Sequence, residues 1–167
     1  MSDPGRHYEL QLIAEPQRFA VVRRIIQAHL RHWDMAELVD AALLGVTELL
    51  DNVHLHVGPR QQCLLRMTAD GGCVRLELHD PSPVLPRLLH ADCDEIGGRG
   101  LALVAALSKE WGAAADGSGG KVVWFSLRAG TRFDPARGGP GAGSGSRAAD
   151  PQDTGAASCG VMAVSRS

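Results

Sequence analysis

Two segments of this chain most constrain its fold, one with a repeated polar stripe and one with a cluster of glycines. The first, GVTELLDNVHLH (residues 45–56), places Glu48, Asn52 and His56 at every fourth position among apolar residues. Residues four apart stack on one face of a helix, so the spacing predicts an apolar helix with one polar stripe. A carboxylate, an amide and an imidazole together suit a site that holds a metal ion, activates a hydroxyl and orients a phosphate. The alternative is a solvated helix face.

The second segment, DEIGGRGLALVAAL (residues 94–107), has Gly97, Gly98 and Gly100 around Arg99, directly before an apolar stretch. The apolar stretch predicts a helix that begins at the glycines. Backbone amides at a helix start cradle phosphate when no side chains are in the way. Arg99 would add a charged hydrogen bond to such an anion. The alternative is a flexible loop with a helix-initiating turn.

The order of the predicted elements favours an α+β fold. Strand-like segments occur in pairs and do not alternate strictly with helices, which indicates a two-layer sandwich and not a doubly wound parallel sheet. Asp70-Gly71-Gly72 between two such segments is a hairpin signal. The predicted elements are a strand at 8–14, helices at 16–33 and 35–56, strands at 61–69 and 73–80, a helix at 100–111, a strand near 114 and a strand at 121–127.

Length and composition indicate one folded domain followed by a tail. The chain has 167 residues, and its composition changes near Arg128. We therefore expect a folded unit at 8–128 and a disordered tail at 129–167, because Gly, Ala, Ser and Pro cannot bury enough surface to order a chain. A net charge of −2 argues against a nucleic-acid binder. The lack of a long apolar run or a signal-peptide core predicts a cytoplasmic protein without a membrane span.

The four cysteines form no close pair, which argues against a zinc site. Cys63 and Cys73 fall in strand-like segments and are expected to be small core residues. Cys93 lies in an irregular segment and is a candidate reactive thiol. Cysteine usage therefore points to free thiols in a reducing compartment.

Asp80 and Lys121 lie at the two ends of predicted strands. Asp80 ends one strand and opens the segment DPSPVLP, where its carboxylate can accept a hydrogen bond from an exocyclic amine such as that of adenine. The alternative is turn chemistry, since Asp before Pro commonly starts a turn. Gly119-Gly120-Lys121 precedes the last strand, and a hairpin turn explains it well.

In their order and spacing these segments resemble the Bergerat ATP-binding fold of histidine kinases, DNA gyrase, heat-shock chaperones and mismatch-repair ATPases. TELLDNVHLH matches the asparagine box, HDPSP the first glycine box, GGRGLALV the second and GGKVVWF the last. The segment between Asp80 and Gly98, which corresponds to the lid of this fold, is short. With this short lid, the chain is most similar to the anti-sigma-factor serine/threonine kinases of the actinobacterial branch. The resemblance implies a mixed, mostly antiparallel sheet covered by helices on one face.

The resemblance also implies ATP and Mg²⁺ as cofactors and a role for each residue of the site. Glu48 would be the catalytic base and Asn52 the magnesium ligand. Asp80 would read the adenine amino group. The remaining nucleotide-binding residues would be Gly98, Arg99, Gly100 and Lys121.

The partners implied by the resemblance are a small anti-anti-sigma protein of the STAS type and a sigma factor. A serine of the anti-anti-sigma protein would be the substrate, and its phosphorylation adds about two negative charges that would break binding. The unphosphorylated protein would compete with the sigma factor for the kinase. Two copies of the chain would pair through the helix side near the N-terminus.

Three positions depart from the family pattern. Ser82 stands where the first glycine box usually has glycine, Val122 stands where a threonine or serine commonly supports the adenine, and Asp51 adds a carboxylate beside Asn52. Val122 and Ser82 leave a second reading open, in which a catalytically weak or inactive nucleotide-binding fold acts as a docking module. A redox-responsive regulator that uses Cys93 is a third.

Overall fold

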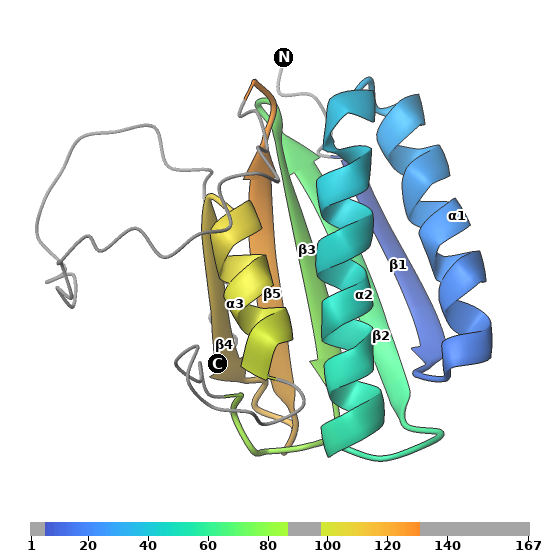
Figure 1. Ribbon diagram of the computed structural model, residues 1–167, viewed down its shortest axis with the longest axis vertical. Coiled ribbons are helices and arrows are strands. Elements are labelled where there is room, and N and C mark those ends of the chain that lie inside the picture. The colour runs from blue at the N-terminus through green and yellow to red at the C-terminus, as the bar shows by residue number, and fades with distance from the viewer. Residues whose placement is uncertain (1–5, 87–97, 131–167) are drawn as a thin grey trace, which may run out of the picture. The chain divides into compact units, whose positions relative to one another are not determined.

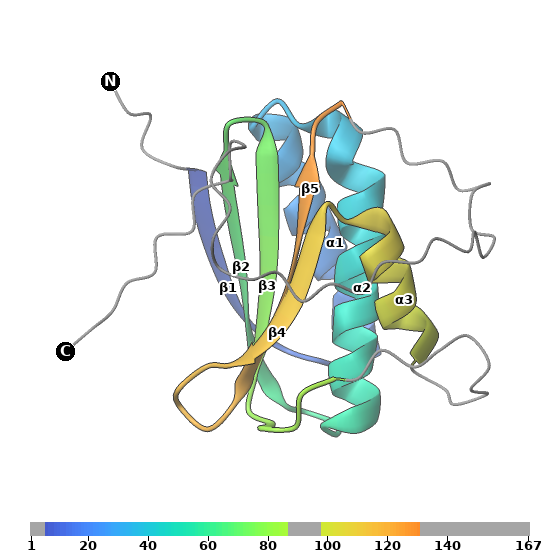
Figure 2. The same ribbon diagram turned by 90° about the vertical axis from the view of Figure 1, so that its left-hand side faces the viewer.

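Five strands in the described part of the chain form one antiparallel sheet, and helices cover one of its faces (Figures 1 and 2). The computed structural model describes residues 6–86 and 98–130, which belong to one compact unit. Every strand pair is antiparallel, so the predicted two-layer α+β fold is confirmed. The elements are β1 (Arg6–Ile13), α1 (Pro16–His32), the short 3-10 helix η1 (Ala36–Leu38), α2 (Val39–His56), β2 (Gln62–Asp70), β3 (Cys73–Asp80), α3 (Gly98–Leu107), β4 (Glu110–Ala115) and β5 (Lys121–Arg128).

The strand order across the sheet is β1-β2-β3-β5-β4. The hairpin between β2 and β3 turns at Gly71 and Gly72, whose φ angles are 53° and 78°, so the predicted hairpin is confirmed. Both positions have the left-handed backbone that a tight hairpin requires and glycine adopts without strain. Ala129 donates its backbone N–H to the Gly72 carbonyl at 2.8 Å. The rest of the predicted tail, from residue 131 on, lies outside the described residues.

The core lies between the sheet and the helices because strand side chains alternate between two faces. On β2, Cys63, Leu65 and Met67 face the helices and are buried. Cys63 and Cys73 are buried free thiols, as expected, and burial together with the Asp80 charge raises the pKa of Cys63 to about 12. Cys63 is therefore a neutral packing residue at neutral pH.

The middle helix, α2, packs closely on β5 through a glycine. A Cβ atom on Gly45 would lie 2.5 Å from Cζ of Phe125, which is fully buried. Because real Cβ atoms do not approach a ring carbon that closely, the absence of a side chain at Gly45 lets the ring fit under the helix. No helix of the described residues combines the length and the apolarity needed to cross a membrane.

The third helix is shorter than its sequence pattern suggested. The predicted helix at 100–111 ends at Leu107, and Trp111 belongs to the edge strand β4, opposite Phe125 of β5. The N–H of Lys109 donates to the carbonyl of Ser126 at 2.8 Å, so the backbone has already left the helix and joined the sheet. The polar residues Ser108, Lys109 and Glu110 separate the apolar run of the helix from Trp111, and they mark the boundary that the prediction placed too late.

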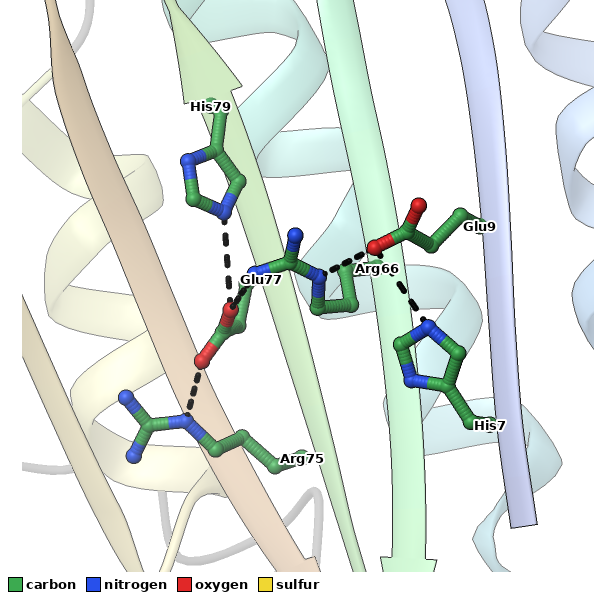
Figure 3. A network of polar contacts seen from close by, with 6 residues as sticks. All are labelled: His7, Glu9, Arg66, Arg75, Glu77 and His79. Atoms are coloured by element: carbon green, nitrogen blue, oxygen red, sulfur yellow. Dashed lines mark hydrogen bonds and ion pairs between the residues drawn. The ribbon is translucent and has the colours of Figure 1, made fainter. Parts of the chain in front are cut away.

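The face of the sheet without helices carries a network of charged side chains (Figure 3). Arg66 Nε donates to Glu9 Oε1 at 2.7 Å, and Arg66 Nη1 lies 3.6 Å from Glu77 Oε2. Arg75 Nε donates to Glu77 Oε1 at 2.6 Å. Ion pairs therefore link side chains of three neighbouring strands, β1, β2 and β3. The members of this open-face network are His7, Glu9, Arg66, Arg75, Glu77 and His79.

Glu77 is the centre of this network. His79 and Arg75 lower the pKa of Glu77 to about 2 against the opposing effect of burial. His79 Nε2 lies 3.4 Å from Glu77 Oε2 and makes no directed hydrogen bond to any described residue, so the two side chains form an ion pair only when the imidazole is protonated. The guanidinium of Arg75 also lies 3.7 Å from the ring centroid of Trp124. The network thus ties β3 to both β2 and β5.

Candidate functional site

The polar stripe of α2 and the glycines of α3 lie against each other, as the sequence predicts. A Cβ atom on Gly100 would be 2.4 Å from Oε2 of Glu48. A carboxylate therefore occupies the space that a side chain at Gly100 would fill. In Figures 1 and 2, α3 lies alongside α2 on the helix side of the sheet. This contact places a carboxylate beside backbone amides at a helix start, the two components of the predicted site.

Glu48 has the properties of a proton acceptor. Partial burial raises the pKa of Glu48, and the charge of Asp51 raises it further. A raised pKa brings a carboxylate closer to neutral pH, where a general base works best. Asp51, the additional carboxylate beside Asn52, is half-buried and acts on Glu48 electrostatically.

Asn52 lies one helical turn after Glu48 and is half-buried, whereas His56, a further turn on, is exposed. Among the described residues no three His, Cys, Asp or Glu side chains are grouped to hold a metal ion. Mg²⁺ commonly binds through one or two protein oxygens, with water and substrate phosphates as its other ligands. A single amide oxygen from Asn52 fits that mode of binding and does not fit a cage made only of protein ligands.

Asp80 is a turn residue with a buried carboxylate, so the turn alternative is confirmed, and the contact with an exocyclic amine stays a prediction. Its Oδ1 accepts hydrogen bonds from the backbone N–H of Ser82 and from Nζ of Lys121, each at 2.9 Å. The side chains of Asp80 and Lys121 are only 1% and 8% exposed. A buried ion pair therefore ends β3 and begins β5 on the helix side of the sheet.

The strand register corrects the role expected of Val122. Asp80 lies directly opposite Lys121, whereas Val122 lies opposite His79 on the open face. Successive side chains of a strand point to opposite faces, so Val122 cannot face the same space as the Asp80 carboxylate. Lys121, and not Val122, is the residue of β5 that lies beside Asp80.

The turn before Lys121 fixes the start of β5. A Cβ atom on Gly120 would lie 2.2 Å from the backbone oxygen of Asp80, so only glycine fits there. Asp116 Oδ1 accepts hydrogen bonds from Ser118 and from the N–H of Gly120, and the Ser118 bonds lower the pKa of Asp116. The sequence signal for this arrangement is the segment DGSGGK, which suggested only a hairpin.

The other predicted residues lie at the start of α3. Gly98 begins the helix, and Arg99 is exposed in its first turn. Gly97 and the candidate thiol Cys93 lie outside the described residues. The described contacts therefore join Glu48 to Gly100 and Asp80 to Lys121, but they give Arg99 no partner in the site.

A cavity of about 430 Å³ lies at the same end of the sheet. Gln11, Gln62 and His79 of the open face line it, together with Asp80 and Ser118. Neither Glu48 nor Gly100 belongs to its lining. This cavity is therefore distinct from the contact between α2 and α3. The Glu48 carboxylate and Gly100 lie on the helix side of the sheet.

Comparison with known proteins agrees with this geometry. No curated protein matches the chain. A family model does match, over residues 12–127, which include both the Glu48–Gly100 contact and the Asp80–Lys121 pair. That family is described as the histidine kinase-like ATPase domain. Because the match covers most of the chain, the protein belongs to the histidine kinase-like ATPase domain family.

Proposed function

We propose that this ATP-binding domain is a protein serine/threonine kinase of the anti-sigma-factor type. Its substrate would be a serine on an anti-anti-sigma protein of the STAS type, and it would also sequester a sigma factor. The observation that carries the kinase proposal is the Glu48 carboxylate in contact with Gly100 at the start of α3. A base with a raised pKa next to a phosphate-binding helix start suits phosphoryl transfer to a hydroxyl.

In the proposed reaction, the serine oxygen of the partner forms a bond to the terminal phosphorus of ATP. The bond from that phosphorus to the bridging oxygen breaks, and ADP leaves. Glu48 accepts the proton of the serine hydroxyl. The backbone amides at Gly98 and Gly100 bind phosphate oxygens, because no side chain blocks their approach. Asp80 accepts a hydrogen bond from the amino group of the base.

Asn52 would contribute its amide oxygen to Mg²⁺. When bound, Mg²⁺ neutralises phosphate charge during transfer. Asn52 lies one turn from Glu48 on the same helix, so the ligand and the base are positioned by one rigid element. This arrangement explains why a mostly apolar helix carries a polar stripe.

A second function is favoured by the Lys121–Asp80 ion pair. Because the carboxylate already accepts two hydrogen bonds, the site is stable without a ligand, and the domain can act as a docking module without phosphoryl transfer. In that case the partner proteins would be bound through the same fold and released by a signal other than phosphorylation.

Calorimetric titration with ATP, with and without Mg²⁺, tests the nucleotide site. We expect Mg²⁺ to strengthen binding to the wild type, and Asn52→Ala to remove that gain. Asp40→Ala, at the exposed far end of α2, is the control and should bind as the wild type does. If the wild type fails to bind ATP at millimolar concentration, the proposed function is wrong.

Transfer from radiolabelled ATP to a purified STAS-type protein then separates the two functions. We expect Glu48→Gln to bind ATP normally and to lose transfer by at least about a hundredfold, since a positioned general base contributes that much. Nucleotide binding by the wild type without transfer to any such protein would favour the docking module.

A further inference from the structure

The Asp80–Lys121 pair uses only part of its capacity for hydrogen bonding. Within the described residues, both hydrogen bonds to the Asp80 carboxylate end at Oδ1, which leaves Oδ2 as the acceptor for a ligand. Lys121 carries three N–H donors and gives one of them to Asp80. A free acceptor and free donors thus stand side by side at the place where the proposed function puts the base.

The pair is held in one place by its surroundings. The strand register sets Asp80 opposite Lys121, and the fit of Gly120 against the Asp80 backbone fixes the start of β5. The thiol of Cys63 faces the pair from β2, and it is neutral because its pKa is about 12. A charge with 8% exposure needs its hydrogen bonds, so the donors of Lys121 favour a ligand that brings acceptors.

Two kinds of purine edge match this combination. A 6-aminopurine presents its amino group as a donor to Oδ2 and its neighbouring ring nitrogen as an acceptor for Lys121. A 6-oxopurine presents its ring N–H as the donor to Oδ2 and its oxygen as the acceptor for Lys121. If an apolar residue replaced Lys121 beside the carboxylate, only the 6-aminopurine would fit well. The carbonyl of a 6-oxopurine would then be buried without a hydrogen-bond donor.

From this geometry we infer that the nucleotide site binds both 6-aminopurine and 6-oxopurine triphosphates, and that Lys121 allows it to bind both bases. The inference rests on the proposed nucleotide site. Lys121 is therefore a specificity residue, since its ammonium would contact the base directly. The flexible side chain of lysine allows its donors to follow either acceptor without movement of β5.

The experiment compares the dissociation constants of ATP and inosine triphosphate, which differ only at the 6-position and the adjoining ring nitrogen. For the wild type we expect the two constants to agree within about tenfold, since each base would make a full set of hydrogen bonds. For Lys121→Met we expect inosine triphosphate to weaken about 10- to 100-fold more than ATP. Lys121→Arg, which keeps a charged donor, should restore binding of inosine triphosphate.

Val122→Thr is the matched control, because it changes the neighbouring residue on the opposite face of the sheet. It should leave the ratio of the two constants unchanged, whereas a general loosening of β5 would change it. Circular dichroism establishes that each variant is folded. If Lys121→Met does not fold, the wild-type ratio and Lys121→Arg still decide the inference.

Three results would overturn the inference. The wild type could bind ATP and reject inosine triphosphate by more than about a hundredfold, as a site that leaves a buried carbonyl unpaired would. Lys121→Met could weaken both nucleotides equally, or Lys121→Arg could fail to restore inosine triphosphate. Binding of neither nucleotide to the wild type would instead contradict the proposed function itself.

Discussion

Oε2 of Glu48 lies 2.4 Å from the position that a Cβ atom on Gly100 would occupy. The contact joins the middle of α2 to the first turn of α3, and it depends on the absence of a side chain. Gly100 is therefore required for the position of the carboxylate as well as for the approach of a phosphate.

Gly100→Ala should displace the Glu48 carboxylate. The end of a glutamate side chain moves easily, so we expect a small change in stability but a loss of transfer of about tenfold or more, because positioning of a catalytic group matters strongly. Transfer rate and thermal unfolding are measured together. Ala102→Ser, at an exposed position of the same helix, is the control. A variant with unchanged transfer would mean that Glu48 does not act from this position.

Glu48→Gln should stabilise the fold at neutral pH. Because the folded state raises the pKa of Glu48, the folded protein holds this proton more tightly than the unfolded chain does. The ionised carboxylate therefore destabilises the fold above that pKa, and the penalty disappears as the pH falls below the ordinary value of 4.5. We expect a gain of about 0.5 kcal/mol at pH 7, since solvent screens a half-exposed charge. Urea unfolding at pH 7 and pH 4 measures it, and an equal gain at both would contradict this cause.

Asp51→Asn should move the pH dependence of phosphoryl transfer. The Asp51 charge contributes to the raised pKa of Glu48, although burial contributes more. Removal of that charge lowers the pKa of the base, so the acidic limb of the rate profile should shift to lower pH while the plateau rate stays similar. His56→Gln, on the exposed last turn of α2, serves as the comparison. An unshifted acidic limb would show that another group controls it.

Glu77→Gln should destabilise the sheet at neutral pH and have no effect in strong acid. His79 and Arg75 lower the pKa of Glu77 to about 2, so its ionised form stabilises the folded state above pH 4.5. That contribution is lost as the pH falls from 4.5 to about 2. We expect a loss of about 1–2 kcal/mol at pH 7 by urea unfolding, as for hydrogen bonds to a partly buried charge. A difference at pH 2 as large as the one at pH 7 would point to packing and not to charge.

Gly45→Ala should destabilise the fold although alanine favours helices. The added Cβ would meet the buried ring of Phe125 at 2.5 Å, and a packed ring cannot move aside freely. We expect a net loss of about 1–3 kcal/mol by urea unfolding. The double variant with Phe125→Leu, which removes the ring edge, should lose less than the sum of the two single changes. Strict additivity would contradict the proposed clash.

The sequence was most informative for site residues that lie close together along the chain. Glu48 and Asn52 were assigned from a four-residue repeat, and the glycines near residue 100 from their place before an apolar helix. The contact between Glu48 and Gly100 confirms that these two segments meet. The β2–β3 hairpin was also predicted, because Gly71 and Gly72 determine the backbone there.

Pairings between strands distant in sequence could not be obtained in the same way. Lys121 was included among the nucleotide-binding residues, but its ion pair with Asp80 depends on the register of β3 and β5, which no local pattern encodes. The same register places Val122 opposite His79 and away from Asp80. Trp111 was placed at the end of a helix, and its pairing with Phe125 in the sheet is likewise a contact between segments distant in sequence.

The turn from Asp116 to Gly120 determines which residue of β5 meets Asp80. Because neighbouring residues of a strand point to opposite faces, a single insertion or deletion in this turn would exchange the two sides of β5. Val122 or Gly120 would then replace Lys121 beside the carboxylate, and Phe125 would leave the core. The length of the loop is thus as strict a requirement as the identity of any residue in the site. The three hydrogen bonds that Asp116 Oδ1 accepts hold the loop at this length.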